Sequence, residues 1–493
     1  MLLSSYTLQG ITVLPVHIEV EVSPGMPVFS IIGMAGTSVQ EAKDRVRSAL
    51  TSSGFRFPLT RKIVNLAPAE LHKSGSHFDL PIALGFLMLT KEIAGFSADT
   101  WALGELSLNG DLRPVKGLLP ALLYARKNGV KRVLLPRGNL AEASLVEGLE
   151  IFGFSHLQEV IEYLKSGERP AFVEDDEKSF MEAEAILDFE SIAGQAGAKR
   201  ALAIAASGGH HVLMSGPPGS GKTLLAQCFV QLLPPLSSEE KLEVLAIHSV
   251  AGREAVSMAN TRPFRSIHPR STPFTVFGGG ASLCPGELSL AHRGVLMMDE
   301  FPEFSREILE GLRGPLEGQE LRLRYGKSSC HYSCDFQLVA TRNPCPCGYA
   351  SDPEKPCRCT AAEKARYQKK ISGPILDRLD LSVEVPRMAY DDFKASPLSG
   401  VSYRERVLAA RERQAWRYKN EGFHVNQHLP PLWLARENLD LKTEDFLRQS
   451  THHYKLSGRA LHKLLKVARS IADFEASERI EYVHMVEALQ YRM

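Results

Sequence analysis

Hydrophobic and polar positions follow two different periods along the first third of the chain. In residues 16–22 every second position is Val or Ile, and this period of two predicts a strand buried on one face. In residues 38–50 apolar side chains recur mostly at spacings of three and four, which predicts an amphipathic helix. Strands and helices mixed in this way predict a compact α/β or α+β domain over residues 1–167.

A change of composition follows this domain. Between Glu168 and Glu190 the chain carries nine acidic residues against two basic ones, Arg169 and Lys178. Like charges at this density repel one another and resist burial, so residues 168–188 are predicted to form an exposed linker.

The pattern after Phe189 is that of a parallel sheet. Short apolar runs alternate with Gly-rich turns and helical stretches, which predicts parallel strands covered by helices in a domain of residues 189–388. From residue 403 onward Leu, Ala, Arg and Glu recur at helical spacing. Residues 389–493 are therefore predicted to be a helical domain that closes the chain.

Bulk composition changes this picture little. The 493 residues exceed what one hydrophobic core usually supports, and 44% hydrophobic against 23% charged residues is ordinary for folded soluble proteins. The formal net charge of +1 neither excludes nor supports a nucleic-acid partner. The first residues do not have the pattern of a secretory signal, and no apolar run approaches a membrane span, so we expect a cytoplasmic protein.

The strongest chemical motif is a glycine-rich loop between a predicted strand, 211–214, and a predicted helix, 224–233. The loop reads Gly216, Pro217, Pro218, Gly219, Ser220, Gly221, Lys222 and Thr223. Glycines let backbone N–H groups point at phosphates, the lysine reaches the β and γ phosphates of a nucleotide, and the threonine hydroxyl is a ligand for Mg²⁺. The flanking strand and helix favour nucleotide binding over a structural glycine-rich turn.

Two later strands end in polar side chains that suit the same site. Residues 294–298 form a predicted buried strand that leads to Asp299, expected to bind Mg²⁺, and Glu300, expected to be the base for an attacking water. The alternative is an acidic cap on the next helix. The predicted strand 336–340 leads to Asn343, whose amide is placed to orient that water.

The order of these motifs, followed by Ser-Gly-Pro-Ile-Leu-Asp-Arg-Leu-Asp at residues 372–380, resembles the AAA+ ATPases. The resemblance is to their magnesium-chelatase-like branch and, within it, to the ComM/YifB family over nearly the whole chain. It implies that Arg378 is an arginine finger for the ATP of a neighbouring subunit and that Arg459 is the second sensor on a helical lid. A finger in trans requires a ring, by analogy a hexamer. The alternative for Arg378 is a salt bridge with Asp377 or Asp380.

The first domain resembles the proteolytic domain of Lon in residues 73–81 and 104–115. A Ser–Lys dyad needs a serine hydroxyl beside a lysine of depressed pKa. The resemblance places the serine position near His77 and the lysine position near Leu119 or Ala121, and none of these side chains supplies that chemistry.

A shifted dyad is the alternative, with Ser74 or Ser76 as nucleophile and Lys116 as base. We expect instead a domain without peptidase activity that serves as a ring-forming or substrate-guiding platform.

Four of the eight cysteines lie close together, at Cys345, Cys347, Cys357 and Cys359. Four thiolates on one short loop suit a tetrahedral Zn²⁺ site, and such a site is structural because four protein ligands leave no open position. The alternative is four reduced loop cysteines, because the two CxC pairs depart from the commoner CxxC spacing.

Two basic segments are candidates for contact with DNA. The first carries Arg262, Arg265 and Arg270, and we expect it to be a mobile basic loop ahead of three successive glycines. The second, residues 320–327, alternates around a glycine and is predicted to be a hairpin. Arg322, Arg324 and Lys327 of this hairpin would bind phosphates, and Tyr325 would stack on a base. The alternative for both segments is a solvated charged face.

The family resemblance implies an ATP-driven ring motor on DNA, with helicase or branch-migration activity on recombination intermediates when transforming DNA is integrated. Its expected ligands and partners are ATP, Mg²⁺, further copies of the chain and single-stranded or branched DNA, with no membrane. Three alternatives stay open: a chelatase-type ATPase that remodels a protein partner for metal insertion, a Lon-type ATP-dependent peptidase, and an ATP-gated DNA clamp.

Overall fold

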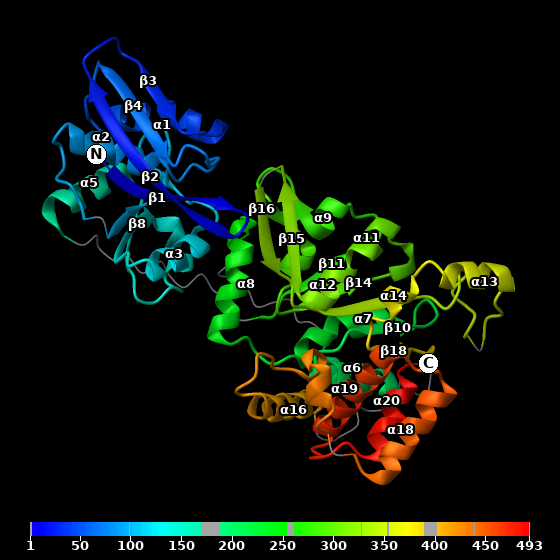
Figure 1. Ribbon diagram of the computed structural model, residues 1–493. Helices are drawn as coiled ribbons and strands as arrows, with labels where there is room; N and C mark the ends of the chain where they lie inside the picture. Colours follow the sequence, from blue (N-terminus) through cyan, green and yellow to red (C-terminus); the bar gives the residue numbers. More distant parts are fainter. Residues whose placement is uncertain are drawn as a thin grey trace.

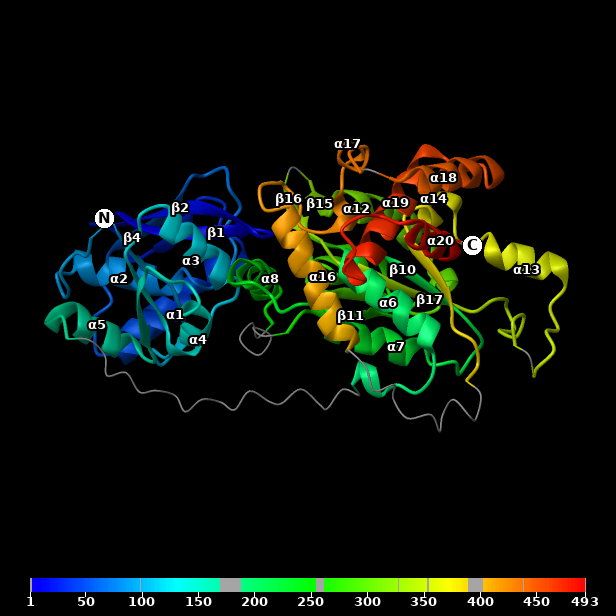
Figure 2. The same cartoon turned by 90° about the horizontal axis from the view of Figure 1, so that it is seen from below.

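The computed structural model describes residues 2–97, 99–168, 188–253, 261–326, 328–352, 354–388, 402–437 and 439–492. Most of the predicted linker and residues 389–401 of the predicted C-terminal domain lie outside these ranges, and the predicted domain boundaries stay predictions. Figures 1 and 2 show an N-terminal part that meets a central part at α8, with the C-terminal helices packed on the central part. Within the described ranges, no helix has the length and apolar character that a membrane crossing requires.

The N-terminal part has a four-stranded sheet in the order β1-β2-β4-β3 and a three-stranded parallel sheet in the order β5-β8-β9. In β2 the side chains of Val16, Ile18 and Val20 are buried and alternate with exposed ones, as the period of two predicts. The elements are β1 (Leu2–Gln9), β2 (Thr12–Ser23), β3 (Phe29–Ile32), α1 (Thr37–Ser52), β4 (Arg61–Ala67), α2 (Asp79–Leu89), β5 (Thr100–Ala102), β6 (Glu105–Leu106), β7 (Leu112–Arg113), α3 (Leu118–Lys127), β8 (Arg132–Pro136), α4 (Leu140–Ala143), β9 (Glu150–Phe154) and α5 (Leu157–Ser166).

The central part is built on a five-stranded parallel sheet in the order β11-β14-β17-β10-β18, which confirms the predicted fold class. Its elements are α6 (Ala196–Gly208), β10 (Val212–Ser215), α7 (Lys222–Cys228), α8 (Ser238–Val250), β11 (Phe264–Ile267), α9 (Pro273–Phe277), β12 (Gly278–Gly279), β13 (Cys284–Pro285), α10 (Glu287–Leu290), β14 (Val295–Met298), α11 (Arg306–Gly311), α12 (Arg313–Gly318), β15 (Glu320–Tyr325), β16 (Ser328–Ser333), β17 (Gln337–Arg342), α13 (Ala361–Gln368), α14 (Gly373–Leu376) and β18 (Leu381–Glu384).

The edge strand β11 corrects the expected mobile basic loop. Phe264–Ile267 pairs in parallel with β14, so Arg265 lies on a strand and Arg262 lies just before it. This strand is only four residues long and carries two polar side chains, so its hydrophobic pattern was too weak to indicate a strand.

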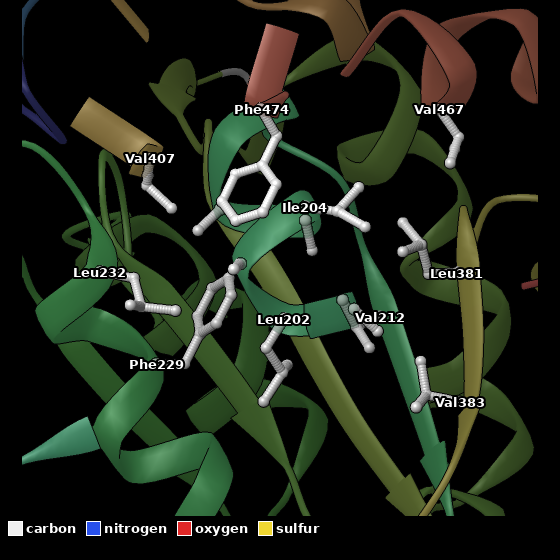
Figure 3. Close-up of a cluster of buried hydrophobic side chains, with 14 of the residues drawn as sticks. Leu202, Ile204, Val212, Phe229, Leu232, Leu381, Val383, Val407, Val467 and Phe474 are labelled. Carbon is white, nitrogen blue, oxygen red and sulfur yellow. The ribbon is translucent and has the colours of Figure 1, made fainter. Parts of the chain in front are cut away.

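The C-terminal helices share one hydrophobic core with the central sheet. They are α16 (Tyr403–Arg417), α17 (Pro431–Leu434), α18 (Leu441–His453), α19 (Gly458–Phe474) and α20 (Tyr482–Gln490). Figure 3 shows Val407 of α16 and Phe474 of α19 against Ile204 of α6, with the strand residues Val212 and Leu381 in the same cluster. Because the core is continuous, the helical lid and the sheet form one packed unit.

The N-terminal part rests on α8 through the beginning of α3. The backbone N–H of Gly117 donates to the carbonyl of Ser249 (3.1 Å), and that of Leu119 donates to the Ser249 hydroxyl (3.4 Å). Leu245 and Ala246 of α8 belong to the same buried cluster as the apolar side chains of α3. The joint therefore satisfies helix-end N–H groups and buries apolar surface at once.

A mutation in the shared core tests this arrangement. Phe474 is 2% exposed, and the Arg406 guanidinium lies 3.9 Å from its ring centroid. Because Phe474→Ala removes a buried aromatic ring, we expect it to lower the free energy of unfolding by about 3–5 kcal/mol. Calorimetry of the full chain measures the effect, with Trp416→Ala as control because Trp416 is 82% exposed. Equal losses in both variants would contradict the shared core.

Candidate functional site

The register of the parallel strands brings three predicted motifs to one edge of the sheet. Ser215 of β10 pairs with Arg342 of β17, so the glycine-rich loop that starts at Gly216 lies beside Asn343. Met298 of β14 pairs with Ala340, which places Asp299 level with Thr341. Carboxyl ends of parallel strands are where such sheets bind ligands.

The glycine-rich loop is shaped as a cradle. Gly219 (φ 77°) and Gly221 (φ 88°) are in the left-handed region, and a Cβ on either would meet no atom within 4 Å. Their backbone therefore faces open space, as an approaching phosphate group requires. The Lys222 ammonium donates to the carbonyls of Gly216 and Pro217, both at 2.8 Å. Burial lowers the pKa of Lys222 below its usual value.

The predicted Mg²⁺ ligands lie together. The Thr223 hydroxyl donates to Asp299 Oδ2 at 3.3 Å, and the Thr341 hydroxyl donates to the other carboxylate oxygen of Asp299. A hydroxyl and a carboxylate are hard oxygen ligands of the kind that Mg²⁺ prefers. The site therefore fits the metal on the chemistry of its donors.

Glu300 occupies an unusual backbone conformation beside these ligands. Its φ of 51° is in the left-handed region, which is uncommon for a residue other than glycine. The Glu300 N–H donates to the Thr341 hydroxyl at 3.1 Å, so this threonine fixes both acidic residues. Strained backbone of this kind gathers at functional sites. Sequence analysis missed Thr341, although this residue directly follows the predicted strand 336–340 and lies two residues before Asn343.

Gln195 is a second residue that sequence analysis missed. Its side-chain amide donates to the carbonyl of Ser220 in the loop (3.3 Å) and to that of Pro386 (2.7 Å). This amide ties the glycine-rich loop to the segment after β18. No local motif around Gln195 indicates this contact.

The two predicted arginines lie near the amino ends of the parallel strands, opposite the carboxyl ends where the glycine-rich loop lies. Arg378 precedes β18, whose Leu381 pairs in parallel with Val212 of β10. From Leu381 to the level of Gly216 the sheet rises about 13 Å at roughly 3.3 Å per residue. Arg378 is thus remote from the glycine-rich loop of its own chain.

Arg378 and Arg459 share one carboxylate. Arg378 Nη2 lies 2.8 Å from Glu317 Oε2, and Arg459 Nη2 lies 2.6 Å from Glu317 Oε1. The partner of Arg378 in the structure is therefore neither Asp377 nor Asp380, which were the predicted alternatives. Glu317 is a third residue that sequence analysis missed, and no spacing relates it to either arginine.

The positions at which Lon carries its dyad are enclosed in the N-terminal part. His77 is 5% exposed, and its Nε2–H donates a hydrogen bond to the carbonyl of Tyr6 at 2.7 Å. Burial lowers the pKa of His77 to about 4. Leu119 and Ala121 are fully buried in α3, and the N–H of Leu119 is bound to Ser249 of α8. The central part thus covers this region of the first domain.

The residues of the alternative Ser–Lys dyad do not contact one another through hydrogen bonds in the described part of the chain. Ser74 is exposed and Ser76 is half-buried. Lys116 lies beside α8, because a Cβ on Gly252 would meet its side chain at 2.7 Å. No hydrogen bond within the described residues joins Lys116 to either serine.

The four predicted cysteines gather at one point. Cys345 Sγ lies 3.3 Å from Cys347 Sγ and 3.6 Å from Cys357 Sγ, and the four sulfurs, with that of Cys359, lie within 4.8 Å of one another. Ligands at the Zn–S distance of about 2.3 Å in a tetrahedron have sulfurs about 3.8 Å apart. Backbone N–H groups of Tyr349 and Arg358 donate to Cys347, and these hydrogen bonds lower its thiol pKa to about 6. Burial raises the pKa of Cys345, so it is the spacing of the four sulfurs that suits the cluster to a metal.

The predicted DNA contacts divide into two groups. Arg262 is bound to the carbonyls of Pro234 and Arg293, and Arg265 forms two hydrogen bonds with Glu287 at 2.5 and 2.9 Å. Both guanidinium groups are thus engaged within the chain. Arg270, Arg322 and Arg324 are exposed, whereas Lys327 lies outside the described residues.

Three family models match the chain. Residues 188–393 match "Magnesium chelatase, subunit ChlI", residues 18–139 match "Subunit ChlI of Mg-chelatase", and residues 398–492 match "Magnesium chelatase, subunit ChlI C-terminal". Together these models account for most of the chain.

Full-length relatives agree with these models. The chain is 39% identical to YifB of Escherichia coli over 98% of its own length and 95% of that protein. It is 39% identical to competence protein ComM of Haemophilus influenzae over 97% of its own length and 94% of that protein. The N-terminal likeness to Lon is weaker: 27% identity to Lon protease 1 of Myxococcus xanthus over 24% of this chain and 16% of that protein.

Two mutations test the assembled site. Because Lys222→Ala removes the ammonium from the cradle, we expect nucleotide affinity to fall by about two orders of magnitude. Glu300→Gln leaves the cradle intact, so we expect it to retain ATP binding and lose turnover. Binding of a fluorescent ATP analogue and phosphate release measure the two effects, with the exposed Lys127→Ala as control. Normal turnover in either site variant would refute the assignment.

Proposed function

Because the chain belongs to the ComM/YifB family of magnesium-chelatase-like AAA+ ATPases, we propose that it is a ring-forming DNA motor driven by ATP hydrolysis. Its activity in this proposal is helicase or branch migration on recombination intermediates during integration of transforming DNA. The printed name of the relative ComM, a competence protein, supports that setting. The ring is a hexamer by family analogy.

The hydrolysis step in this proposal uses residues from both edges of the sheet. Lys222 holds the β and γ phosphates, and Thr223 and Asp299 hold Mg²⁺, which supplies positive charge against the phosphate oxygens. Glu300 takes a proton from the attacking water, and Asn343 orients that water. Because Arg378 and Arg459 are remote from the loop of their own chain, they act on the nucleotide of the neighbouring subunit and stabilise charge on its transferring phosphoryl group.

The observation that carries the DNA part of the proposal is the outer face of the hairpin β15–β16. Register pairs Arg322 with His331 and Arg324 with Ser329, and Arg322, Arg324 and His331 are exposed. Leu323 and Tyr332 point to the other side, where they are buried with Cys330. Tyr325, 56% exposed, ends the first strand. Glu320 lies on the same face as the two arginines, 3.9 Å from His331. The buried face anchors the hairpin, and the arginines of the outer face suit phosphate contact that does not depend on base sequence.

The test of this function is ATP hydrolysis with and without single-stranded and four-way DNA at fixed salt, followed by strand-exchange assays. Stimulation by DNA is the expected result. Equal rates in all samples would favour the protein-remodelling alternative of chelatase type. Stimulation without strand displacement or branch migration would indicate a DNA clamp.

Hairpin variants refine that test. Arg322→Ala with Arg324→Ala removes two phosphate contacts, so we expect the slope of log affinity against log salt to decrease by about two for duplex DNA and by slightly less for single strands. ATP turnover without DNA should be unchanged. Arg448→Ala is the matched control, because Arg448 is an exposed arginine on the helical lid. If the slope of log affinity against log salt is unchanged in the double variant, the hairpin does not contact the DNA phosphates.

We also propose that the four-cysteine cluster holds a structural Zn²⁺. Elemental analysis of the purified full chain should give about one zinc per chain, because four thiolates complete its coordination. Cys357→Ser should lose the zinc. Cys284→Ser should keep it, because Cys284 lies outside the cluster. Absence of zinc from protein purified without chelators, with all four cysteines reduced, would contradict the proposal.

A further inference from the structure

Glu317 lies at the end of α12 and forms ion pairs with two arginines from distant parts of the chain. Each carboxylate oxygen serves one of them: Oε2 lies 2.8 Å from Arg378 Nη2, and Oε1 lies 2.6 Å from Arg459 Nη2. Arg378 comes from the segment before β18, and Arg459 comes from the first turn of α19. A single carboxylate thus fixes the distance between the two guanidinium groups.

Arg378 is held in a defined orientation. Its Nε donates to the carbonyl of Arg313 (3.1 Å), its Nη1 donates to that of Pro374 (2.5 Å), and its Nη2 faces Glu317. Guanidinium has five N–H donors. These three contacts leave two N–H donors, both on the terminal nitrogens, in a side chain that is 9% exposed.

Arg459 is unfavourably placed for the stability of its own helix. The N-terminal end of a helix carries partial positive charge, so a cation in the first turn of α19 is disfavoured there. α19 has no acidic residue in its first turn to offset that charge. Glu317 supplies the missing negative charge from another element, and Arg459 remains 55% exposed.

The ion pair between Arg459 and Glu317 contributes little to stability, because water screens it and ordering two long side chains costs entropy, whereas the Arg378 side chain in the other pair is only 9% exposed. Glu317 itself is 44% exposed. The shared carboxylate does hold two guanidinium groups side by side, near the amino ends of the strands and away from the glycine-rich loop.

We propose that Glu317 is a positioning residue that holds Arg378 and Arg459 as a pair and presents both to the nucleotide of the neighbouring subunit. The proposal rests on the function proposed above, hydrolysis at subunit interfaces. Glu317 makes no contact with the phosphates. It acts by restricting the two arginines, so its loss lowers the rate of the chemical step and leaves nucleotide affinity in the subunit's own loop unchanged.

The test uses Glu317→Gln, which keeps the shape and removes the charge, and Glu317→Ala. We expect kcat for ATP to fall by at least about tenfold in both, while binding of a fluorescent ATP analogue stays at the wild-type value. Glu444→Gln is the control, because Glu444, about as exposed as Glu317, forms an ion pair with Arg448 on the lid and contacts neither Arg378 nor Arg459. Melting temperatures of Glu317→Gln and Glu444→Gln should match that of the wild type, because glutamine can still accept a hydrogen bond from the arginine.

Mixed rings distinguish positioning in trans from a local structural effect. Glu300→Gln subunits are inactive alone and Glu317→Gln subunits keep at most about a tenth of the wild-type kcat. A random equal mixture contains intact interfaces at about one in four positions, so its turnover should exceed that of either variant alone. Glu317→Gln mixed with Arg378→Ala should not exceed the turnover of Glu317→Gln alone, because both defects lie on the same side of the interface.

These mixtures test hydrolysis at subunit interfaces separately from the role of Glu317. If Arg378→Ala and Glu300→Gln subunits fail to rescue each other, hydrolysis at subunit interfaces is wrong. If that pair rescues and the Glu317→Gln mixture does not, only the role of Glu317 is wrong. Wild-type kcat in Glu317→Gln, or a kcat above it, would equally overturn the positioning role.

Discussion

The parallel pairing of β18 with β10 is the constraint on which the rest of the structure depends. It fixes the direction of β18, so that the segment before this strand and the loop after β10 lie at opposite edges of the sheet. A buried carboxylate, Asp380, anchors the beginning of β18: its Oδ2 accepts the N–H of His211 at 3.0 Å, and Lys463 lies 3.2 Å away. Burial opposes the ionisation of Asp380, but Lys463 and the two neighbouring histidines hold its pKa well below the usual value. The charge is therefore retained, and it fixes Arg378 two residues earlier.

The same anchor extends into the lid. Lys463 and Arg459 both belong to the beginning of α19, and the later residues of that helix, among them Val467 and Phe474, are part of the core shared with α6. One helix is thus bound to the sheet at Asp380, to α12 at Glu317, and to the core along its length. Arg459 lies on α19 itself, and Arg378 is linked to that helix through the ion pairs of Glu317 with Arg378 and Arg459 and of Asp380 with Lys463. These contacts couple the position of the lid to the position of the segment that carries Arg378.

The sequence predicts one half of the candidate site much better than the other. Asp299 and Asn343 directly follow strands, and Lys222 ends the loop that follows one. Each is recognisable from a few neighbours, so a local pattern and a parallel sheet suffice to bring them together. Glu317, Thr341 and Gln195 act through partners that are distant in sequence, and only the register and the packing reveal them. Arg262 shows the reverse error: its charge indicated a ligand contact, but its guanidinium is bound to two backbone carbonyls.

The cysteine cluster belongs to the nucleotide site by position. It begins two residues after Asn343, and Gly348 within it lies against Pro218 of the glycine-rich loop. Gly348 has a φ of 84°, and a Cβ there would meet Pro218 at 2.7 Å, so only glycine permits this approach. Because β17, the cysteine loop and Pro218 are in direct contact, the geometry of the four sulfurs sets the position of one wall of the cradle.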